Sequence, residues 1–76
     1  MKNTKKLSEL RVGEGGRVHS IITEGSMRRR FLDIGFTPGA DVLCVGKSPL
    51  GDPIAFIIRG AEIAIRKSDA SGILIV

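Results

Sequence analysis

The segment Gly-Ser-Met-Arg-Arg-Arg-Phe-Leu-Asp-Ile-Gly-Phe-Thr-Pro-Gly, residues 25–39, predicts one short helix with defined ends. Met27, Phe31 and Ile34 recur at i, i+4 and i+7, a spacing that places three apolar side chains on one face of a helix. Ser26 is expected to cap the first turn, because its hydroxyl accepts a backbone N–H that the helix leaves unpaired. The segment therefore predicts a helix with a defined start and a side that faces the core.

The end of this helix is marked as clearly as its start. Gly35 suits the left-handed backbone position that follows a last helical turn, because glycine has no Cβ. Phe36 is then expected to contact Phe31, since an apolar pair of this kind often accompanies such a helix end. Pro38-Gly39 prevents the helix from resuming and turns the chain.

On either side of the helix, the sequence is typical of short strands separated by turns rich in Gly and Pro. One short helix after the first long strand, with about five strands in 76 residues, predicts a mainly β protein with a small, strongly bent barrel. The strands are expected at residues 17–22, 40–45, 54–59, 62–66 and 73–76, with a polar or single helical turn over residues 67–72.

The alternation of side chains predicts which residues face the interior. Val18 and Ile22 are expected together on one face of the first strand. The strand over residues 40–45 is apolar on both faces, as in the core of a barrel. Gly60-Ala61 is expected to form a hairpin turn with glycine at the first central position. The expected inward side chains of the next two strands are Phe56, Ile58, Ile63 and Ile65.

The length and charge indicate one domain with a basic end. Residues 1–6 are interpreted as a flexible basic tail and residues 7–76 as the domain. The formal net charge is +4, but without Lys2, Lys5 and Lys6 nine basic residues face eight acidic ones, which leaves +1. A nearly neutral domain argues against a nucleic-acid partner. No apolar run approaches the roughly 20 residues of a membrane-spanning helix.

The residues that often carry chemistry occur alone in this chain. His19 has no partners at metal-ligand spacing and is interpreted as a solvated side chain. Cys44 stands between Leu and Val without a nearby base, so it is interpreted as a buried apolar residue. We therefore expect no enzyme activity, no catalytic residue, no metal ligand and no cofactor.

The aromatic content excludes two further classes of binding barrel. Phe31, Phe36 and Phe56 all lie in apolar patterns, and the chain has no Tyr or Trp. Barrels that bind single-stranded nucleic acid stack bases on exposed aromatic side chains, and binders of Pro-rich peptides line their grooves with them. Neither set of exposed aromatic residues is expected here.

Two segments are candidates for contact with a partner protein. Arg28-Arg29-Arg30 is either a solvated helix face, with Arg29 loosely paired to Asp33, or a patch for an acidic partner. Three cations in a first helical turn oppose the helix dipole, so local stability does not explain them. The turn Pro49-Leu50-Gly51 would present an exposed Leu as an anchor. The candidate partner-binding residues are Met27, Arg28, Arg29, Arg30, Pro49, Leu50 and Gly51.

Several elements in a fixed order resemble the FeoA family, over essentially Leu7 to Val76. The departures are mild, namely Phe31 where Leu is usual and the Lys-rich end. The elements that carry the resemblance are Leu32-Asp33-Ile34-Gly35, Pro38-Gly39, Val42, Pro49, Gly51-Asp52-Pro53, Gly60, Ile63-Ala64-Ile65-Arg66, Ala70, Ile73 and Ile75, preceded by Leu7, Leu10, Gly13 and Val18.

The resemblance implies an SH3-like barrel that serves bacterial ferrous iron uptake. It implies a cytoplasmic accessory protein that docks on the membrane transporter and GTPase FeoB, at the inner face of the membrane, without itself spanning it. Transition-metal binding is an expectation at the level of the family. The same module resembles the C-terminal domain of DtxR-type repressors, which leaves open a metal-responsive regulatory module. A homo-oligomer formed through the C-terminal strand also remains open.

Overall fold

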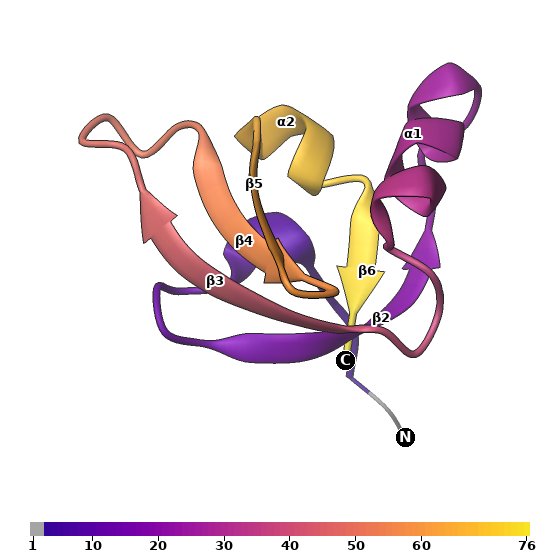
Figure 1. Ribbon diagram of the computed structural model, residues 1–76, viewed down its shortest axis with the longest axis horizontal. Coiled ribbons are helices and arrows are strands. Elements are labelled where there is room, and N and C mark those ends of the chain that lie inside the picture. Colours follow the sequence, from indigo (N-terminus) through magenta and orange to yellow (C-terminus); the bar gives the residue numbers. More distant parts are fainter. Residues whose placement is uncertain (1–2) are drawn as a thin grey trace.

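The computed structural model describes residues 3–76, which form six strands, two short α-helices and one 3-10 helix (Figure 1). The strands pair antiparallel in the order β1-β6-β2-β3-β4-β5. The elements are β1 Lys5–Lys6, η1 Leu7–Glu9, β2 Gly15–Ile21, α1 Ser26–Ile34, β3 Asp41–Lys47, β4 Ile54–Ile58, β5 Ala61–Ile65, α2 Lys67–Ala70 and β6 Ile73–Ile75.

The predicted mainly β, SH3-like fold is confirmed, with six strands in place of about five. The strands curl around one interior, but β1 and β5 do not pair, so the sheet keeps two edges. Figure 1 places α1 at one end of the long axis and the β3–β4 turn at the other, with α2 between them. Residues 67–72 contain the single helical turn that was one of the two expectations.

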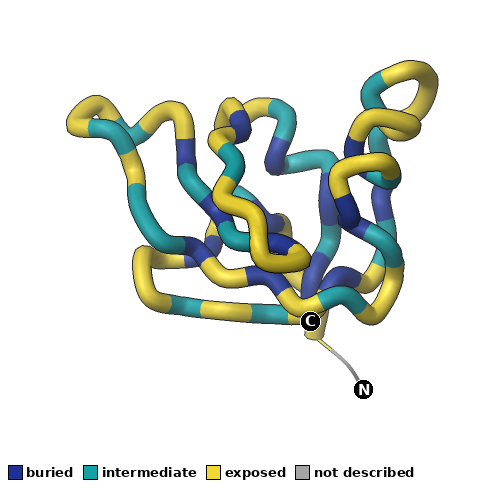
Figure 2. The backbone as a smooth tube through the Cα atoms, viewed as in Figure 1, coloured by how far each residue is buried: buried dark blue, intermediate teal, exposed yellow. Residues whose placement is uncertain are grey.

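The core lies inside this curl, where Figure 2 shows buried positions on every long strand. Phe31, Phe36 and Phe56 are all buried, as predicted, and Cys44 has no exposed surface. The remaining core residues are Leu7, Leu10, Val18, Ile21, Val42, Ile54, Ile58, Ile65, Ala70, Ile73 and Ile75.

The predicted inward face of the first strand was wrong at one position. Val18 is buried, but Ile21 occupies the core and Ile22 is 57% exposed. The pairing of β2 with β6 shifts between Val18 and Ser20, as a β-bulge does, and the extra residue moves every later side chain to the other face. Simple alternation therefore fails beyond the bulge.

Strand β3 is buried on one face, although its sequence is apolar on both. Val42 and Cys44 lie in the core, whereas Leu43 is 39% exposed. On the β4–β5 hairpin, Phe56, Ile58 and Ile65 are buried as predicted, and Ile63 is half-buried against the core.

The expected hairpin turn is displaced by one residue. Ile58 pairs with Ala61, so the central residues of the turn are Arg59 and Gly60, with φ of 50° and 81°. A two-residue turn of type I′ requires positive φ at both central positions. The prediction of Gly60 at the first position was wrong because Arg59 adopts the left-handed conformation.

Helix α1 has the predicted length but a different cap. Gly25 with φ of 76° is the N-cap residue, and no side chain caps the first turn, so the predicted Ser26 cap was wrong. Gly35 ends the helix with φ of 130°, as predicted. The Phe36 backbone N–H donates to the Phe31 carbonyl at 2.9 Å, and the two rings meet edge to face with centroids 5.8 Å apart.

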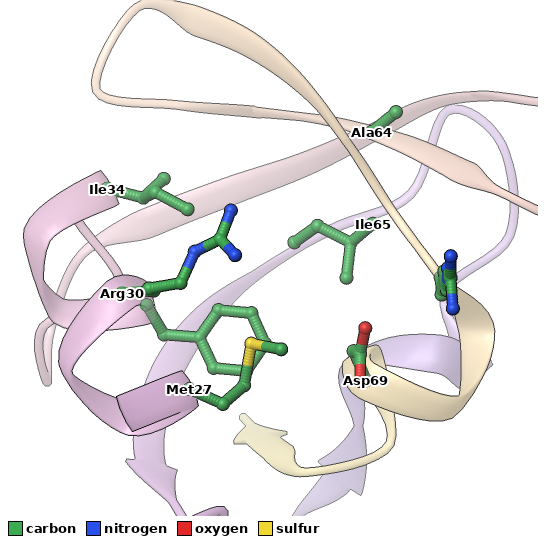
Figure 3. A pocket seen from close by; sticks show the side chains of 8 residues that line it. Met27, Arg30, Ile34, Ala64, Ile65 and Asp69 are labelled. Atoms are coloured by element: carbon green, nitrogen blue, oxygen red, sulfur yellow. The ribbon is translucent and has the colours of Figure 1, made fainter. Parts of the chain in front are cut away.

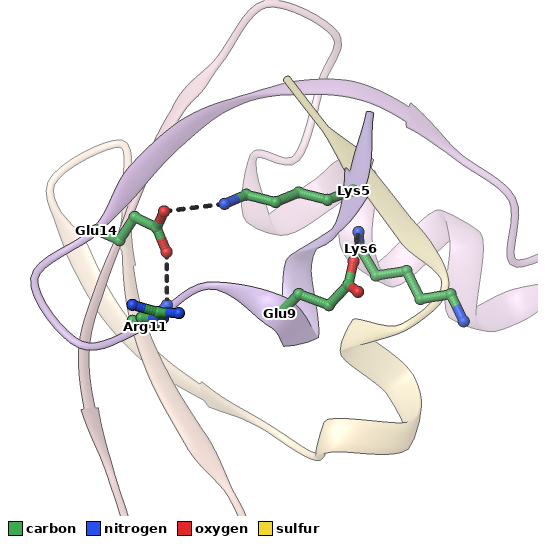
Figure 4. Close-up of polar contacts among 5 residues, drawn as sticks. All are labelled: Lys5, Lys6, Glu9, Arg11 and Glu14. Atoms are coloured by element: carbon green, nitrogen blue, oxygen red, sulfur yellow. Dashed lines mark hydrogen bonds and ion pairs between the residues drawn. The ribbon is translucent and has the colours of Figure 1, made fainter. Parts of the chain in front are cut away.

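The N-terminal end differs from the expected flexible tail where the structure describes it. Lys5 and Lys6 form β1 and pair with Ile75 and Leu74 of β6, whereas Lys2 lies outside the described residues. The Lys6 backbone N–H donates to the Glu9 carboxylate at 2.6 Å (Figure 4). Among the described residues the first strand therefore begins at Lys5, and the domain boundary at Leu7 stays a prediction.

Glu14 ties this end of the chain together, as Figure 4 shows. Its carboxylate accepts the Arg11 backbone N–H at 2.8 Å and lies 2.9 Å from the Lys5 ammonium. The Arg11 hydrogen bond, followed by the Lys5 side chain, holds the pKa of Glu14 below its usual range.

Candidate interaction surface

The three arginines at the start of α1 differ in the contacts that their side chains make. The Arg28 guanidinium donates to the carbonyl of Ile21 at 2.6 Å, so this side chain fastens the helix to the end of β2. Arg29 and Arg30 are exposed. Within residues 3–76, no ion pair forms between Arg29 and Asp33, so the loose pairing considered from the sequence is not found. Met27 is half-buried and packs against the core.

The β3–β4 turn presents Leu50 on a hydrogen-bonded base. The Leu50 side chain is 95% exposed. Below it, the Ser48 hydroxyl donates to the carbonyl of Asp52, and its oxygen accepts the Asp52 backbone N–H at 3.1 Å. The Asp52 carboxylate accepts the backbone N–H of Lys67 at 2.8 Å, which joins the turn to α2. The exposure expected of Leu50 is confirmed, and its role in binding stays a prediction.

The two predicted segments do not form one patch. Figure 1 shows the start of α1 and the β3–β4 turn at opposite ends of the molecule, with α2 between them. A partner that contacts both segments would have to span this distance.

A groove of about 330 Å³ lies between α1 and β5 (Figure 3). Five of its eight lining residues are apolar, and the other three are two arginines and one aspartate. In Figure 3, Met27, Arg30 and Ile34 project from the helix toward Ile65 of β5. The lining residues are Met27, Arg30, Phe31, Ile34, Ala64, Ile65, Arg66 and Asp69.

Sequence reasoning found the helix side of this groove and missed the strand side. Met27 and Arg30 were candidates, but Ala64, Ile65 and Arg66 were assigned only to a returning strand. The sequence signal for the strand side was that residues 61–65 are the second strand of a hairpin and carry a single charge, that of Glu62. Recognising it as an edge required the order of the sheet, which no local pattern contains.

The isolated reactive residues do not join this groove. His19 is exposed, with its Nδ1 3.1 Å from the hydroxyl of Ser20, and Cys44 is buried in the core. Among residues 3–76, no three side chains of His, Cys, Asp or Glu lie close enough together to hold a metal ion. The arrangement offers surfaces for binding. None of the helices in residues 3–76 is long and apolar enough to cross a membrane.

Comparison with known proteins gives a consistent result over nearly the whole chain. The sequence model of the FeoA domain matches residues 5–76. The Fe(2+) transport protein A/Fe(2+) transporter FeoB fusion protein of Porphyromonas gingivalis is 32% identical over 68 residues, which cover 90% of this chain. This chain spans only 8% of the length of that fusion protein.

Two solved structures of FeoA proteins share the fold. The FeoA-like protein from Clostridium acetobutylicum is 36% identical, with a TM-score of 0.90 over 100% of this chain and 88% of its own. Stenotrophomonas maltophilia FeoA, solved in complex with zinc and described as a prokaryotic SH3 domain protein, is 28% identical. Its TM-score is 0.84 over 93% of this chain and 88% of its own.

Proposed function

The chain belongs to the FeoA family, and from this premise we propose that it docks on FeoB and supports or regulates that transporter without catalysing a reaction. Ferrous iron transport is the process that the family serves. In this proposal the protein works in the cytoplasm, at the inner face of the membrane, and iron is the cargo of its partner.

The observation that carries the proposal is the fused relative from Porphyromonas gingivalis. One polypeptide there contains a segment similar to this chain together with the transporter. Covalent linkage holds two modules at high effective concentration, an arrangement that favours modules that contact each other. We propose the same contact between this chain and FeoB.

We place the contact on the start of α1 and on the β3–β4 turn. The helix contributes Met27 and the three arginines Arg28 to Arg30, and the turn contributes Pro49, Leu50 and Gly51. What supports this placement is that Arg29 and Arg30 are exposed cations and that Leu50 is 95% exposed. Exposed anchors of this kind contribute to interfaces when a partner buries them.

The test is a titration of the isotope-labelled protein with solubilised FeoB from the same organism, with and without GTP. We expect amide shifts on residues 25–30 and 48–51. Arg29→Glu and Leu50→Ala should each weaken the complex, by roughly fivefold or more. Absence of binding in both nucleotide states would overturn the proposal.

Matched control variants separate the surface from general effects. Arg11→Glu makes the same charge change as Arg29→Glu, but on an exposed arginine outside the proposed surface, in the region of Lys5 and Glu14. Val12→Ala truncates another exposed apolar side chain, one that is 57% exposed. Both controls should bind FeoB as the wild type does. Equal weakening by the controls would contradict the proposed surface.

A metal-responsive module remains the alternative function. The zinc complex of the relative from Stenotrophomonas maltophilia favours it. In this chain His19 is exposed and Cys44 is buried, so these two side chains do not form a joint site. Equilibrium dialysis with Fe²⁺ under anaerobic conditions tests the alternative. Saturable binding that is lost in His19→Ala or Cys44→Ser would favour it over docking.

A further inference from the structure

We propose that the groove between α1 and β5 binds an extended peptide of alternating acidic and apolar residues, which adds as a further strand to the free edge of β5. This proposal rests on the proposed function only in assigning the peptide to FeoB.

The edge of β5 has backbone groups available for a new strand. Within residues 3–76, β4 alone pairs with β5, and the closing pair beside the two-residue turn is Ile58 with Ala61. Hydrogen-bonded and non-hydrogen-bonded pairs alternate along antiparallel strands, so Ala61, Ile63 and Ile65 bond to β4. The N–H and C=O groups of Glu62 and Ala64 therefore point away from the sheet.

The edge of β5 lacks the features that protect most exposed edges. Its five residues pair with β4 without a register shift, contain no Pro and carry one charge, that of Glu62. Exposed edge strands of natural proteins are usually short, contain a β-bulge or carry lysine side chains, because an unprotected edge can pair with a strand of another chain. Strand addition is a common way in which such an edge binds a peptide.

The groove beside this edge supplies places for side chains of the added strand. Ala64, whose backbone groups point outward, lines it together with Ile65. Phe31, Met27 and Ile34 of α1 form the opposite apolar wall. A neighbouring strand lies about 4.8 Å from β5, and alternate side chains of that strand would meet this wall.

Charge on the groove selects an acidic occupant. Arg30 and Arg66 stand on its two sides, and within residues 3–76 neither forms an ion pair. The lining also contains one carboxylate, Asp69, which leaves an excess of one positive charge. An occupant with carboxylates at alternate positions would match the two arginines.

A second copy of this chain is a poorer occupant. Twofold pairing of two β5 edges places the same surface on both sides of the interface. The two grooves, each with Arg30 and Arg66, would then lie beside each other, and like charges in an interface are unfavourable.

The alternation of acidic and apolar residues in the proposed peptide also sets its register on β5, because a shift by one residue would turn the apolar side chains of the peptide to solvent.

The probe is the soluble peptide acetyl-Asp-Val-Glu-Ile-Glu-Val-Asp-Ser-amide, titrated into the labelled protein at low salt. We expect amide shifts on residues 61–66 and on the groove side of α1. The same peptide with Lys at its acidic positions should bind at least about tenfold more weakly. Shifts confined to other surfaces, or equal binding of both peptides, would overturn the proposal.

Backbone methylation of the peptide tests strand addition without changing the protein. One version carries N-methyl groups on its odd residues and a second on its even residues. Only one set of N–H groups faces β5 in a strand, so one version should lose binding by about tenfold while the other keeps it. Equal affinity of the two versions would exclude strand addition.

Charge reversal tests the groove from the side of the protein. Arg30→Glu with Arg66→Glu should weaken binding of the acidic peptide by roughly tenfold and strengthen binding of the lysine peptide. The matched control, Arg11→Glu with Lys6→Glu, changes net charge equally at exposed residues outside the groove and should alter affinity much less. An equal loss in the control, or β5 shifts that grow with protein concentration alone, would contradict the proposed occupant.

The tests with peptide and with FeoB fail in different ways. A peptide that binds β5 and is not displaced by FeoB would support the groove and overturn its assignment to the transporter. Absence of peptide binding at β5, with FeoB still shifting the amides of residues 25–30 and 48–51, would overturn the groove and keep the proposed function.

Discussion

The two edges of the sheet are built in opposite ways. The β1 edge consists of only Lys5 and Lys6, both exposed, and Glu14 holds it through exposed polar contacts. The β5 edge is longer, carries one charge and borders a groove lined by apolar side chains, two arginines and one aspartate. A short lysine edge resists pairing with other chains, whereas an open apolar edge permits it.

The difference also concerns how each side is stabilised. Near β1, the side-chain contacts of Glu14 are an exposed hydrogen bond and an exposed ion pair, which add little to the free energy of unfolding beyond the pairing of β1 with β6. Opposite β5, helix α1 has one buried residue within Ser26–Ile34, namely Phe31. The helix wall of the groove therefore depends chiefly on the packing of Phe31, with Met27 and Leu32 partly buried beside the core.

Removing the anchor of α1 should have the largest effect. Phe31 is 2% exposed and contacts Phe36 edge to face. Phe31→Ala should lower the free energy of unfolding by about 3–5 kcal/mol, because it removes buried apolar area and leaves a cavity. Urea denaturation measures the change, and Leu50→Ala is the exposed control. A loss below about 1 kcal/mol would contradict the anchor role.

A methyl group at the end of α1 should have an intermediate effect. Gly35 has φ of 130°, and an added Cβ would lie 2.9 Å from Cδ of Arg59. Gly35→Ala should cost about 1–3 kcal/mol through backbone strain and displacement of Arg59. Gly46→Ala is the matched control, because nothing lies within 4 Å of its added Cβ. Equal denaturation midpoints for the two variants would contradict this account.

The β1 edge should show the smallest effect, and that effect should depend on pH. The pKa of Glu14 is lowered in the folded protein, so its contribution to stability is present at neutral pH and is lost as the pH falls through the lowered pKa. Glu14→Gln should lower the melting temperature slightly at about pH 7. The difference from wild type should shrink at about pH 3.

Two results would contradict this account of the β1 edge. A difference in melting temperature between Glu14→Gln and wild type that grows on acidification would contradict the direction of the pKa change. A decrease in the melting temperature of Glu14→Gln at neutral pH as large as that of Phe31→Ala would show that the contacts of Glu14 at the β1 edge are not weak. Glu9→Gln, at the other carboxylate of this region, provides a comparison.

The errors of sequence reasoning on the fold have specific physical causes. Ile22 was placed in the core because alternation cannot reveal the bulge after Val18. The hairpin turn was shifted because Arg59 adopts a positive φ that its residue type does not favour. Lys5 and Lys6 looked like a solvated end because their strand partner, β6, lies some 70 residues later in the chain.

The sequence alone determined the helix over residues 26–34, its end at Gly35, the aromatic core and the family, because these depend on local spacing and on residue type. The tertiary structure decided which strand became an open edge and brought Arg66 opposite Arg30. Those two arginines are 36 positions apart, and their proximity is a consequence of how the strands pair rather than of any local pattern.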